Sequence, residues 1–212
     1  MRYAAGHKER TRAKILQAAG KVFRREGYHA AGVDKVMEEA GLTAGGFYAH
    51  FGSKEALLAE ALAPAAAEAG VPRDKDLEGI TGCAWAEAFV ERYLSPSHRL
   101  RTEDGCPLPA LVSEVARADA PVKASFEAII RALAARLQGQ VGADLTEDRA
   151  LAIIALCVGG LGVARSVQDA DFGERILAAC RDLAMLGLVI GADVQTPVEP
   201  PRKQKRSGRL LR

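Results

Sequence analysis

The sequence lacks the residue patterns of an enzyme or a metalloprotein. Its four histidines are scattered without a His-x-x-x-His pair, and it contains neither a Gly-x-Ser-x-Gly elbow nor a phosphate-binding P-loop. Its four cysteines form no Cys-x-x-Cys pair, which argues against a zinc site and against a disulfide framework. We therefore expect no catalytic residues, no metal and no cofactor.

Aromatic residues, strand-like alternation and long apolar runs are also scarce. Aromatics make up 5% of the 212 residues, whereas alanine and leucine are abundant, so we expect an all-α fold. The longest apolar run, residues 150–164, is shorter than the ~20 residues needed to cross a bilayer. Residues 1–20 are rich in charge and have no continuous apolar stretch, so we expect a cytoplasmic protein with no membrane partner.

Charge is distributed unevenly along a chain whose net charge is only +2. Residues 1–54 carry a net charge of +5, residues 55–190 carry −7, and residues 191–212 carry +4. A basic end on an acidic body is typical of a protein that presents that end to DNA, although solvated surfaces alone can give the same imbalance. We expect a DNA-binding domain over residues 1–55, an effector-binding and dimerisation domain over 56–190, and a basic, disordered tail over 191–212.

Residues 33–58 follow the order of a helix-turn-helix, in which a short helix, a tight turn and a second short helix precede a capped third helix. Apolar residues at helical spacing give the first of these helices one buried face: Val33, Val36, Met37 and Ala40. Gly41 then ends this helix, because glycine can adopt the left-handed conformation at a sharp bend. The order suits delivery of the second helix into the DNA major groove.

The second helix of the motif is expected over about residues 44–50, with the Thr43 hydroxyl as its N-cap. Phe47 and Phe51, spaced i and i+4, are expected to anchor this helix to the core. The residues expected to point outward are Tyr48, Ala49 and His50. Gly45 and Gly46 each destabilise so short a helix by roughly 1 kcal/mol relative to alanine. One interpretation is that the glycines let the backbone approach DNA closely, which offsets this cost. A loose surface turn is the alternative interpretation.

Residues 33–58 and the preceding helix over residues 10–28 resemble the DNA-binding domain of the tetracycline-repressor (TetR) family. The resemblance covers about the first fifty-eight residues and depends on the ungapped pattern G-L-T-x-G-x-F-Y-x-H-F-x-S-K-E-A-L. It implies an all-helical homodimer whose recognition helix reads a double-stranded DNA operator. Repression rather than activation of transcription is part of what the family leads us to expect.

The resemblance assigns two sets of DNA-facing positions. Phosphate contacts fall at Thr43, Tyr48 and Lys54. The face that meets DNA holds Ala44, Gly45 and His50. Gly32 stands where the family usually has a capping Ser or Thr that touches phosphate, and Ala44 replaces a longer polar residue. We therefore expect sparse base readout and a larger contribution from the shape of the DNA.

Helical periodicity continues through the second domain, with a helix expected over residues 77–93 and a long loop over 95–107. The resemblance implies that the last two helices pair with those of a second copy. Gly159, Gly160 and Gly162 lie in the first of these two helices and permit a close approach of another backbone. Close packing inside one subunit is the alternative interpretation of these glycines.

An effector pocket is one interpretation of the apolar residues in the second domain. The residues expected to form it are Trp85, Phe89, Tyr93, Phe126 and Ile130. An ordinary core explains the same pattern. The resemblance favours a small apolar effector, because many TetR proteins release DNA when a ligand enters this domain.

Cys106 is a candidate redox or electrophile sensor. Pro107 suits a first helical position, which puts Cys106 at the N-cap, where the helix dipole and free amides stabilise a thiolate. The Gly-Cys-Pro-Leu motif also resembles the second domain of a TetR subgroup, some members of which sense electrophiles or oxidants through a cysteine. A small residue packing at a helix start is the alternative. The other thiols are expected to be inert core residues: Cys83, Cys157 and Cys180.

The whole chain is therefore predicted to be a homodimeric transcriptional regulator, released from a palindromic operator by a small apolar effector or by modification of Cys106. The alternative is a helical protein-interaction module with only non-specific DNA affinity. The basic tail adds either salt-sensitive DNA affinity or solubility.

Overall fold

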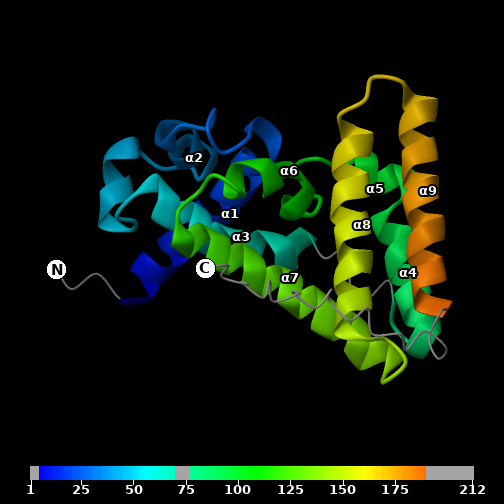
Figure 1. Cartoon of the computed structure of the whole chain (residues 1–212). Helices are drawn as coiled ribbons and strands as arrows, with labels where there is room; N and C mark the ends of the chain where they lie inside the picture. The colour runs from blue at the N-terminus through cyan, green and yellow to red at the C-terminus, as the bar shows by residue number, and fades with distance from the viewer. Residues whose placement is uncertain (1–4, 70–76, 190–212) are drawn as a thin grey trace, which may run out of the picture.

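The structure, a computed structural model, describes residues 5–69 and 77–189 of the chain. Within these ranges all regular structure is helical, which confirms the predicted all-α fold (Figure 1). The elements are α1 (Ala5–Glu26), α2 (Val33–Glu39), the 3-10 helix η1 (Ala44–Ala49), α3 (Lys54–Ala69), α4 (Gly82–Tyr93), α5 (Pro96–Leu100), α6 (Pro107–Val115), α7 (Ala120–Val141), α8 (Glu147–Arg165) and α9 (Ala170–Val189). The tail predicted over residues 191–212 lies outside the described residues.

Helices α1, α2, η1 and α3 form a small bundle at one end of the molecule (Figure 1). Each of them contributes buried apolar side chains to its centre: Ile15, Val22, Phe23, Val36, Met37, Phe47, Leu57 and Leu58. This arrangement confirms the predicted N-terminal helix-turn-helix. It also fixes the orientation of the short elements, because each of them buries only one or two large side chains.

Helix α3 packs on both sides of the boundary predicted between residues 55 and 56. It contacts α1 in the N-terminal bundle and α7 in the second domain. A methyl group added at Gly20 of α1 meets Ala65 Cβ of α3 at 3.0 Å, so these two helices are in close contact. A continuous helix thus leads from the end of the motif into the second domain.

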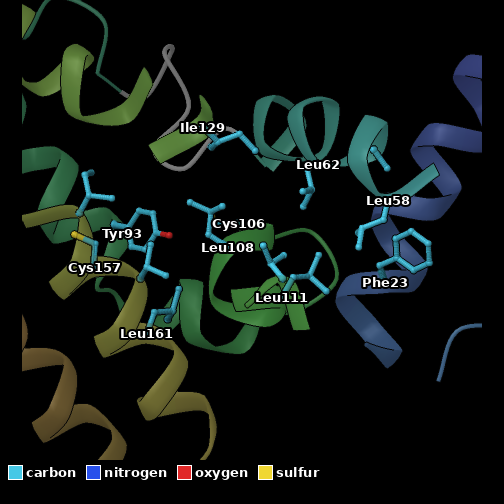
Figure 2. Packing of buried hydrophobic residues seen from close by; sticks show 14 of the residues in the cluster. Phe23, Leu58, Leu62, Tyr93, Cys106, Leu108, Leu111, Ile129, Cys157 and Leu161 are labelled. Atoms are coloured by element: carbon cyan, nitrogen blue, oxygen red, sulfur yellow. The ribbon is translucent and has the colours of Figure 1, made fainter. Parts of the chain in front are cut away.

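The buried apolar residues of the two domains form one continuous cluster. Figure 2 shows the cluster running from Phe23 past Leu58 and Leu111 to Tyr93 and Cys157. Helix α6 supplies the central part of this path, since Pro107, Leu108, Leu111 and Val115 are all buried. Movement of one domain therefore disturbs packing in the other.

Two predictions for residues 77–107 were wrong. Helix α4 begins at Gly82, not at residue 77, because Gly79 and Gly82 both have positive φ angles, at 78° and 66°, which break the helix. The predicted long loop contains the one-turn helix α5, whose N-cap Ser95 accepts a hydrogen bond on Oγ from His98 N at 3.2 Å. Pro96 in the first turn also favours a helix start at this position. The sequence prediction missed α5 because the segment is rich in turn-forming residues.

Helices α8 and α9 form an antiparallel pair at the end of the molecule opposite the N-terminal bundle (Figure 1). Helix α7 runs between the two ends, where it contacts α3, α4 and α8. Among the helices described, none combines the length and apolar character needed to cross a membrane.

Candidate nucleic-acid interface

Element η1 presents a polar and small-residue surface to solvent. The exposed side consists of Thr43, Ala44, Gly45 and Tyr48, and the Tyr48 side chain is 76% exposed. Thr43 occupies the N-cap with an extended backbone, but its hydroxyl makes no capping hydrogen bond. The predicted capping bond is therefore absent.

Two phenylalanines attach η1 to the core, as predicted. Phe47 and Phe51 are buried, and their rings stack with centroids 5.8 Å apart. The segment between them keeps Tyr48 and Ala49 exposed and leaves His50 half-buried. Burial of both rings holds a short element whose own sequence forms helix poorly.

Element η1 is a 3-10 helix rather than the predicted α-helix. Gly45 and Gly46 lower its helix propensity, and six residues allow few internal hydrogen bonds. A methyl group added at Gly45 meets no atom within 4 Å. Another molecule can therefore come as close to this backbone as the glycine permits.

His50 lies at the C-cap of η1, beside the first turns of α1. Its Nδ1 atom is enclosed and has no hydrogen-bond partner among the described residues. Burial, together with the nearby charges of Lys8 and Arg12 and with His7, lowers the pKa of the imidazole. Lys8 and Arg12 thus form a basic corner around His50. The sequence analysis did not predict this corner, although the basic residues at the start of α1 indicate positive charge there.

Lys54 begins α3, and its ammonium lies close to the loop after α1. The Nζ atom is 4.3 Å from the centre of the Tyr28 ring and donates a 3.5 Å hydrogen bond to the carbonyl of His29. Residues 40–54 contain no Asp or Glu. The surface around η1 therefore carries positive charge without a carboxylate in its own segment, which favours polyanions.

Helix α2 begins without a side-chain cap. Gly32 occupies its N-cap with φ −74° and ψ 157°, and no side chain bonds to the first turn. The first turn of α2 therefore receives no hydrogen bond from a side chain at its N-cap.

Two charged side chains join the N-terminal bundle to the second domain. Arg24 of α1 is only 4% exposed and donates hydrogen bonds to the carbonyls of Ala65, at 3.2 Å, and Glu103. Glu114 of α6 accepts from the backbone amides of Tyr28 at 2.8 Å and His29 at 3.0 Å. These contacts connect α3, α6 and the loop before α6 to the helix beneath η1.

The residues predicted to line an effector pocket occupy the packed interior or its edge. Trp85, Phe89 and Tyr93 are buried, with ring centroids 5.5 Å and 5.8 Å apart along α4. Phe126 and Ile130 of α7 are half-buried and pack against the core. The cavities described among residues 5–69 and 77–189 are lined by other residues.

Cys106 is the N-cap of α6, as predicted, but its environment does not activate the thiol. The residue is 6% exposed and lies in the cluster of Figure 2. Burial raises the pKa of the thiol, although Tyr93, the Leu108 amide and two arginines act in the opposite direction. The prediction of a stabilised thiolate was wrong, because desolvation exceeds the effect of the helix start.

The backbone around Cys106 is held by a buried histidine. The Cys106 amide donates to His98 Nε2 at 3.1 Å, and His98 Nδ1 lies 2.8 Å from the Tyr93 carbonyl. Burial lowers the pKa of His98 to about 4, so the imidazole is neutral and able to accept this hydrogen bond. The arrangement fits a structural role for the loop that precedes α6.

The remaining cysteines differ from one another more than predicted. Cys157 is buried, and desolvation raises the pKa of its thiol strongly, as expected for an inert core residue. Cys180 is partly buried, and Cys83 near the start of α4 is exposed, which corrects the expectation of a core thiol. No group of three or more His, Cys, Asp or Glu among the described residues has the geometry of a metal site.

A second exposed surface is apolar and lies on α8 and α9. Five of the eight large exposed apolar side chains described belong to these two helices: Val163, Phe172, Leu183, Leu186 and Val189. On α9 the apolar residues follow each other at spacings of four and three: Phe172, Ile176, Ala179, Leu183 and Leu186. Ile176 of this apolar stripe also packs against the core, whereas Phe172, Leu183 and Leu186 are exposed to solvent.

Two glycines of α8, Gly159 and Gly160, have different surroundings. A methyl group added at Gly160 falls 2.7 Å from Cys180 Sγ, so Gly160 permits close packing of α9 in the same chain. Gly159 is exposed and has no atom within 4 Å of the added methyl position. The alternative of packing inside one subunit thus holds for Gly160, whereas Gly159 remains open to another molecule.

Residues 15–61 match the family described as bacterial regulatory proteins, tetR family. The chain is also 33% identical over 88 residues to the HTH-type transcriptional regulator UidR of Escherichia coli, an alignment that covers 42% of this chain and 43% of UidR. The alignments with the curated relatives cover between 25% and 60% of those proteins' lengths. The family match lies in the N-terminal part of the chain that carries η1.

Solved structures extend the likeness to most of the fold. A TetR transcriptional regulator from Chloroflexus aurantiacus superimposes with a TM-score of 0.67 and 23% identity, over 83% of this chain and 94% of that one. The reduced form of E. coli NemR gives a TM-score of 0.62 at 21% identity, over 81% and 95%. The second domain therefore has a TetR-like fold as well.

Proposed function

We propose that this protein, which carries the DNA-binding domain of the TetR family on a TetR-like fold, is a cytoplasmic, homodimeric, sequence-specific DNA-binding regulator of transcription that acts as a repressor. One observation carries the proposal above the others. Two buried phenylalanines hold η1 rigidly while its small and polar residues face solvent without a carboxylate in the segment. Such an element suits the major groove of DNA.

We assign the residues of η1 and its neighbours to two kinds of contact. Phosphate contacts come from Thr43, Tyr48 and Lys54, and His50 lies on the face that meets DNA. Ala44 and Gly45 bring the backbone close to the bases, which leaves shape as a large part of recognition. The basic corner around His50 adds Lys8 as a further phosphate partner, since the neighbouring Arg12 is ion-paired with Glu60.

Dimerisation takes place through the apolar stripe of α8 and α9. A four-helix contact between two copies buries the exposed side chains of this stripe, and Gly159 allows the backbones to approach. Two η1 elements related by a two-fold axis then read two half-sites of a palindrome.

Release from DNA follows binding of a small molecule in the second domain. Helix α3 and the contacts of Arg24 and Glu114 connect that domain to α1 and η1. An effector that favours the DNA-incompetent arrangement shifts the population away from operator binding. The continuous core of Figure 2 supports such coupling, since α6 packs between the two ends.

The deciding experiment is selection of a random duplex library on the purified protein at physiological salt, followed by sequencing of the bound pool. Enrichment of a two-fold symmetric site is expected, and the Tyr48→Ala variant is expected to bind that site more weakly. Recovery of only unenriched, salt-labile DNA would leave the proposal without its basis and favour a helical protein-interaction module.

The dimer contact has its own test. Replacing Leu183 by Glu places a charge in the apolar stripe, so sedimentation is expected to report a monomer that no longer binds the symmetric site. Leu100→Glu is the matched control, because Leu100 is exposed on α5, outside the two helices that carry the stripe. A dimer that survives Leu183→Glu would exclude this surface.

Modification of Cys106 is a less direct route to release, because the thiol is buried and its pKa is raised. The Cys106→Ser variant is expected to respond to hypochlorite or quinones as the natural chain does, in a DNA-release assay. Loss of that response in the serine variant alone would restore Cys106 as the sensor.

A further inference from the structure

The segment around η1 lacks every side chain that reads a base through a pair of hydrogen bonds or as a carboxylate acceptor. Residues 40–53 contain no Arg, Lys, Asn, Gln, Asp or Glu. In the major groove Arg and Lys select guanine, Asn and Gln select adenine, and Asp and Glu select cytosine. Recognition of bases by this segment therefore depends on other groups.

Three long basic side chains that flank the segment already have partners within the chain. Arg12 of α1 is ion-paired with Glu60, and Lys35 of α2 lies 2.6 Å from a carboxylate oxygen of Glu26. Lys54 lies over an aromatic ring and donates to a backbone carbonyl of the loop after α1. These side chains are therefore engaged elsewhere and do not replace the missing base readers of η1.

The groups that η1 exposes are mainly hydrocarbon. Ala44, Gly45 and Ala49 are exposed, and so is the ring of Tyr48. Thr43, exposed directly before η1, adds a methyl group beside its hydroxyl. The hydroxyls of Thr43 and Tyr48 both donate and accept hydrogen bonds, so they fit several base edges and discriminate poorly. The exposed side of η1 is thus small and largely apolar.

The major-groove edges of the four bases carry a single kind of apolar group, the 5-methyl group of thymine. We infer that η1 selects a thymine in each half-site by packing the methyl group of Ala44 against the 5-methyl group of that base. A methyl group added at the neighbouring Gly45 meets no atom within 4 Å, so the base edge has room to reach this contact. The inference names the base that η1 selects, and it rests on the proposed function.

Ala44 suits this contact because its methyl group has a fixed position. It is the first residue of η1, and Phe47, three residues later, is buried in the core. Side chains three residues apart lie one above the other in a 3-10 helix, so the anchored ring also fixes the direction of the Ala44 methyl group. Alanine has no rotamers to restrict, so the contact involves no loss of side-chain entropy.

The first test removes thymine methyl groups from the symmetric duplex that the library selection yields. Replacing a thymine by deoxyuridine keeps every hydrogen bond of the base pair and removes only the methyl group. At one symmetric position this change is expected to weaken binding about 4-fold per half-site, or about 15-fold when both half-sites are changed. The same replacement in flanking DNA is the control, with an expected change below about two-fold.

The second test separates the methyl group from the rest of the base pair. Replacing T·A by C·G at the sensitive position changes the hydrogen-bonding pattern of the pair, and 5-methylcytosine then restores only the methyl group. The 5-methylcytosine duplex is expected to bind about 4-fold more tightly per half-site than the cytosine duplex. Equal binding of the two duplexes would overturn the inference and assign this position to hydrogen bonds or to DNA shape.

A variant locates the contact on the protein. Ala44→Gly removes the partner methyl group, so the ratio of the affinities for thymine and deoxyuridine duplexes is expected to fall from about 4-fold per half-site to below about two-fold. Ala49→Gly is the matched control, because Ala49 is exposed at the other end of the same element, and it is expected to keep the ratio. Weaker binding by Ala44→Gly with an unchanged ratio would mean that Ala44 serves only the folding of η1, and would overturn the inference.

The failure of this inference is distinguishable from the failure of the proposed function. A library selection that yields no symmetric site overturns both. A symmetric site at which no thymine is sensitive to loss of its methyl group overturns only the inference, because the protein then still binds DNA specifically by other contacts.

Discussion

Gly45 of η1 and Gly160 of α8 have opposite surroundings. A methyl group added at Gly45 meets no atom within 4 Å, whereas one added at Gly160 falls 2.7 Å from Cys180 Sγ. In α8 the space that glycine leaves is filled by α9 of the same chain. In η1 it is left open on a segment that carries positive charge around it. Glycine therefore allows another helix of the chain to pack closely at Gly160, whereas at Gly45 it leaves the backbone open to solvent.

The largest expected effect comes from filling the closed position. Gly160→Val forces the added methyl groups against α9, so the free energy of unfolding is expected to fall by about 3 kcal/mol. Chemical denaturation at fixed protein concentration measures this change. Gly139→Val is the control, since Gly139 of α7 has open space around it. Equal stability of the two variants would remove the distinction between closed and open glycines.

Filling the open position is expected to change DNA affinity without changing stability. In Gly45→Leu the added side chain prevents the DNA duplex from approaching the η1 backbone closely. We therefore expect the variant to bind the selected symmetric duplex about 30-fold more weakly, which corresponds to about 2 kcal/mol of binding free energy. Fluorescence anisotropy with the selected duplex measures the affinity, and denaturation checks the fold. Gly139→Leu provides the same substitution in the second domain. Full affinity of Gly45→Leu would mean that the backbone of η1 does not approach DNA closely.

The two regions are also expected to differ in their dependence on pH, through His98 in the second domain and His50 beside η1. The effect of His98 is expected to be the larger. His98 is buried with a pKa of about 4, below its ordinary value of 6.5. The His98 side chain therefore binds a proton near pH 6.5 in the unfolded chain but only near pH 4 in the folded chain. The free energy of unfolding keeps its full value above pH 6.5 and decreases as the pH falls from 6.5 to 4. Between pH 7 and pH 5 we expect a loss of about 2 kcal/mol.

Denaturation of the natural chain and of His98→Gln at both pH values isolates this contribution. The variant is expected to be less stable at pH 7 and to lose less stability on acidification, because Gln does not titrate. Parallel pH profiles of the two proteins would show that His98 is not the titrating group.

His50 is expected to give the smallest effect, and on binding rather than on stability. Burial and the neighbouring basic residues lower its pKa in the free protein, and a nearby phosphate acts in the opposite direction. DNA binding therefore takes up protons, and affinity is expected to rise about 3-fold per pH unit as pH falls below 7. Anisotropy titrations at several pH values measure the slope. A His50→Gln variant with an unchanged slope would exclude this role.

The sequence predicted the N-terminal domain well for a physical reason. In residues 33–58 helix-breaking glycine, capping residues and anchoring aromatics occur at fixed local spacings, and local spacing decides where short helices begin and end. The burial of Phe47 and Phe51 and the exposure of Tyr48 followed from their positions alone. The capping bond of Thr43 failed because it depends on a side-chain rotation that spacing does not fix.

The second domain was predicted less completely, because its decisive contacts join residues far apart in the chain. Cys106 lies at a helix start, as its neighbour Pro107 indicated, but its burial and raised pKa depend on packing against α4 and α8. A groove between α3 and α7 forms where alanine-rich faces of the two helices meet, and the sequence of neither helix indicates that they pack against each other.

By itself the sequence determined the helical class, the position of η1 and the side of η1 that faces solvent, since these follow from periodicity and from local turn chemistry. Tertiary structure alone decided that Gly160 is closed and Gly159 open, that Arg24 and Glu114 join the two domains, and that α3 and α7 leave a cavity between them. The reason is that packing between distant segments depends on the volumes and charges brought together in space, which no local spacing encodes.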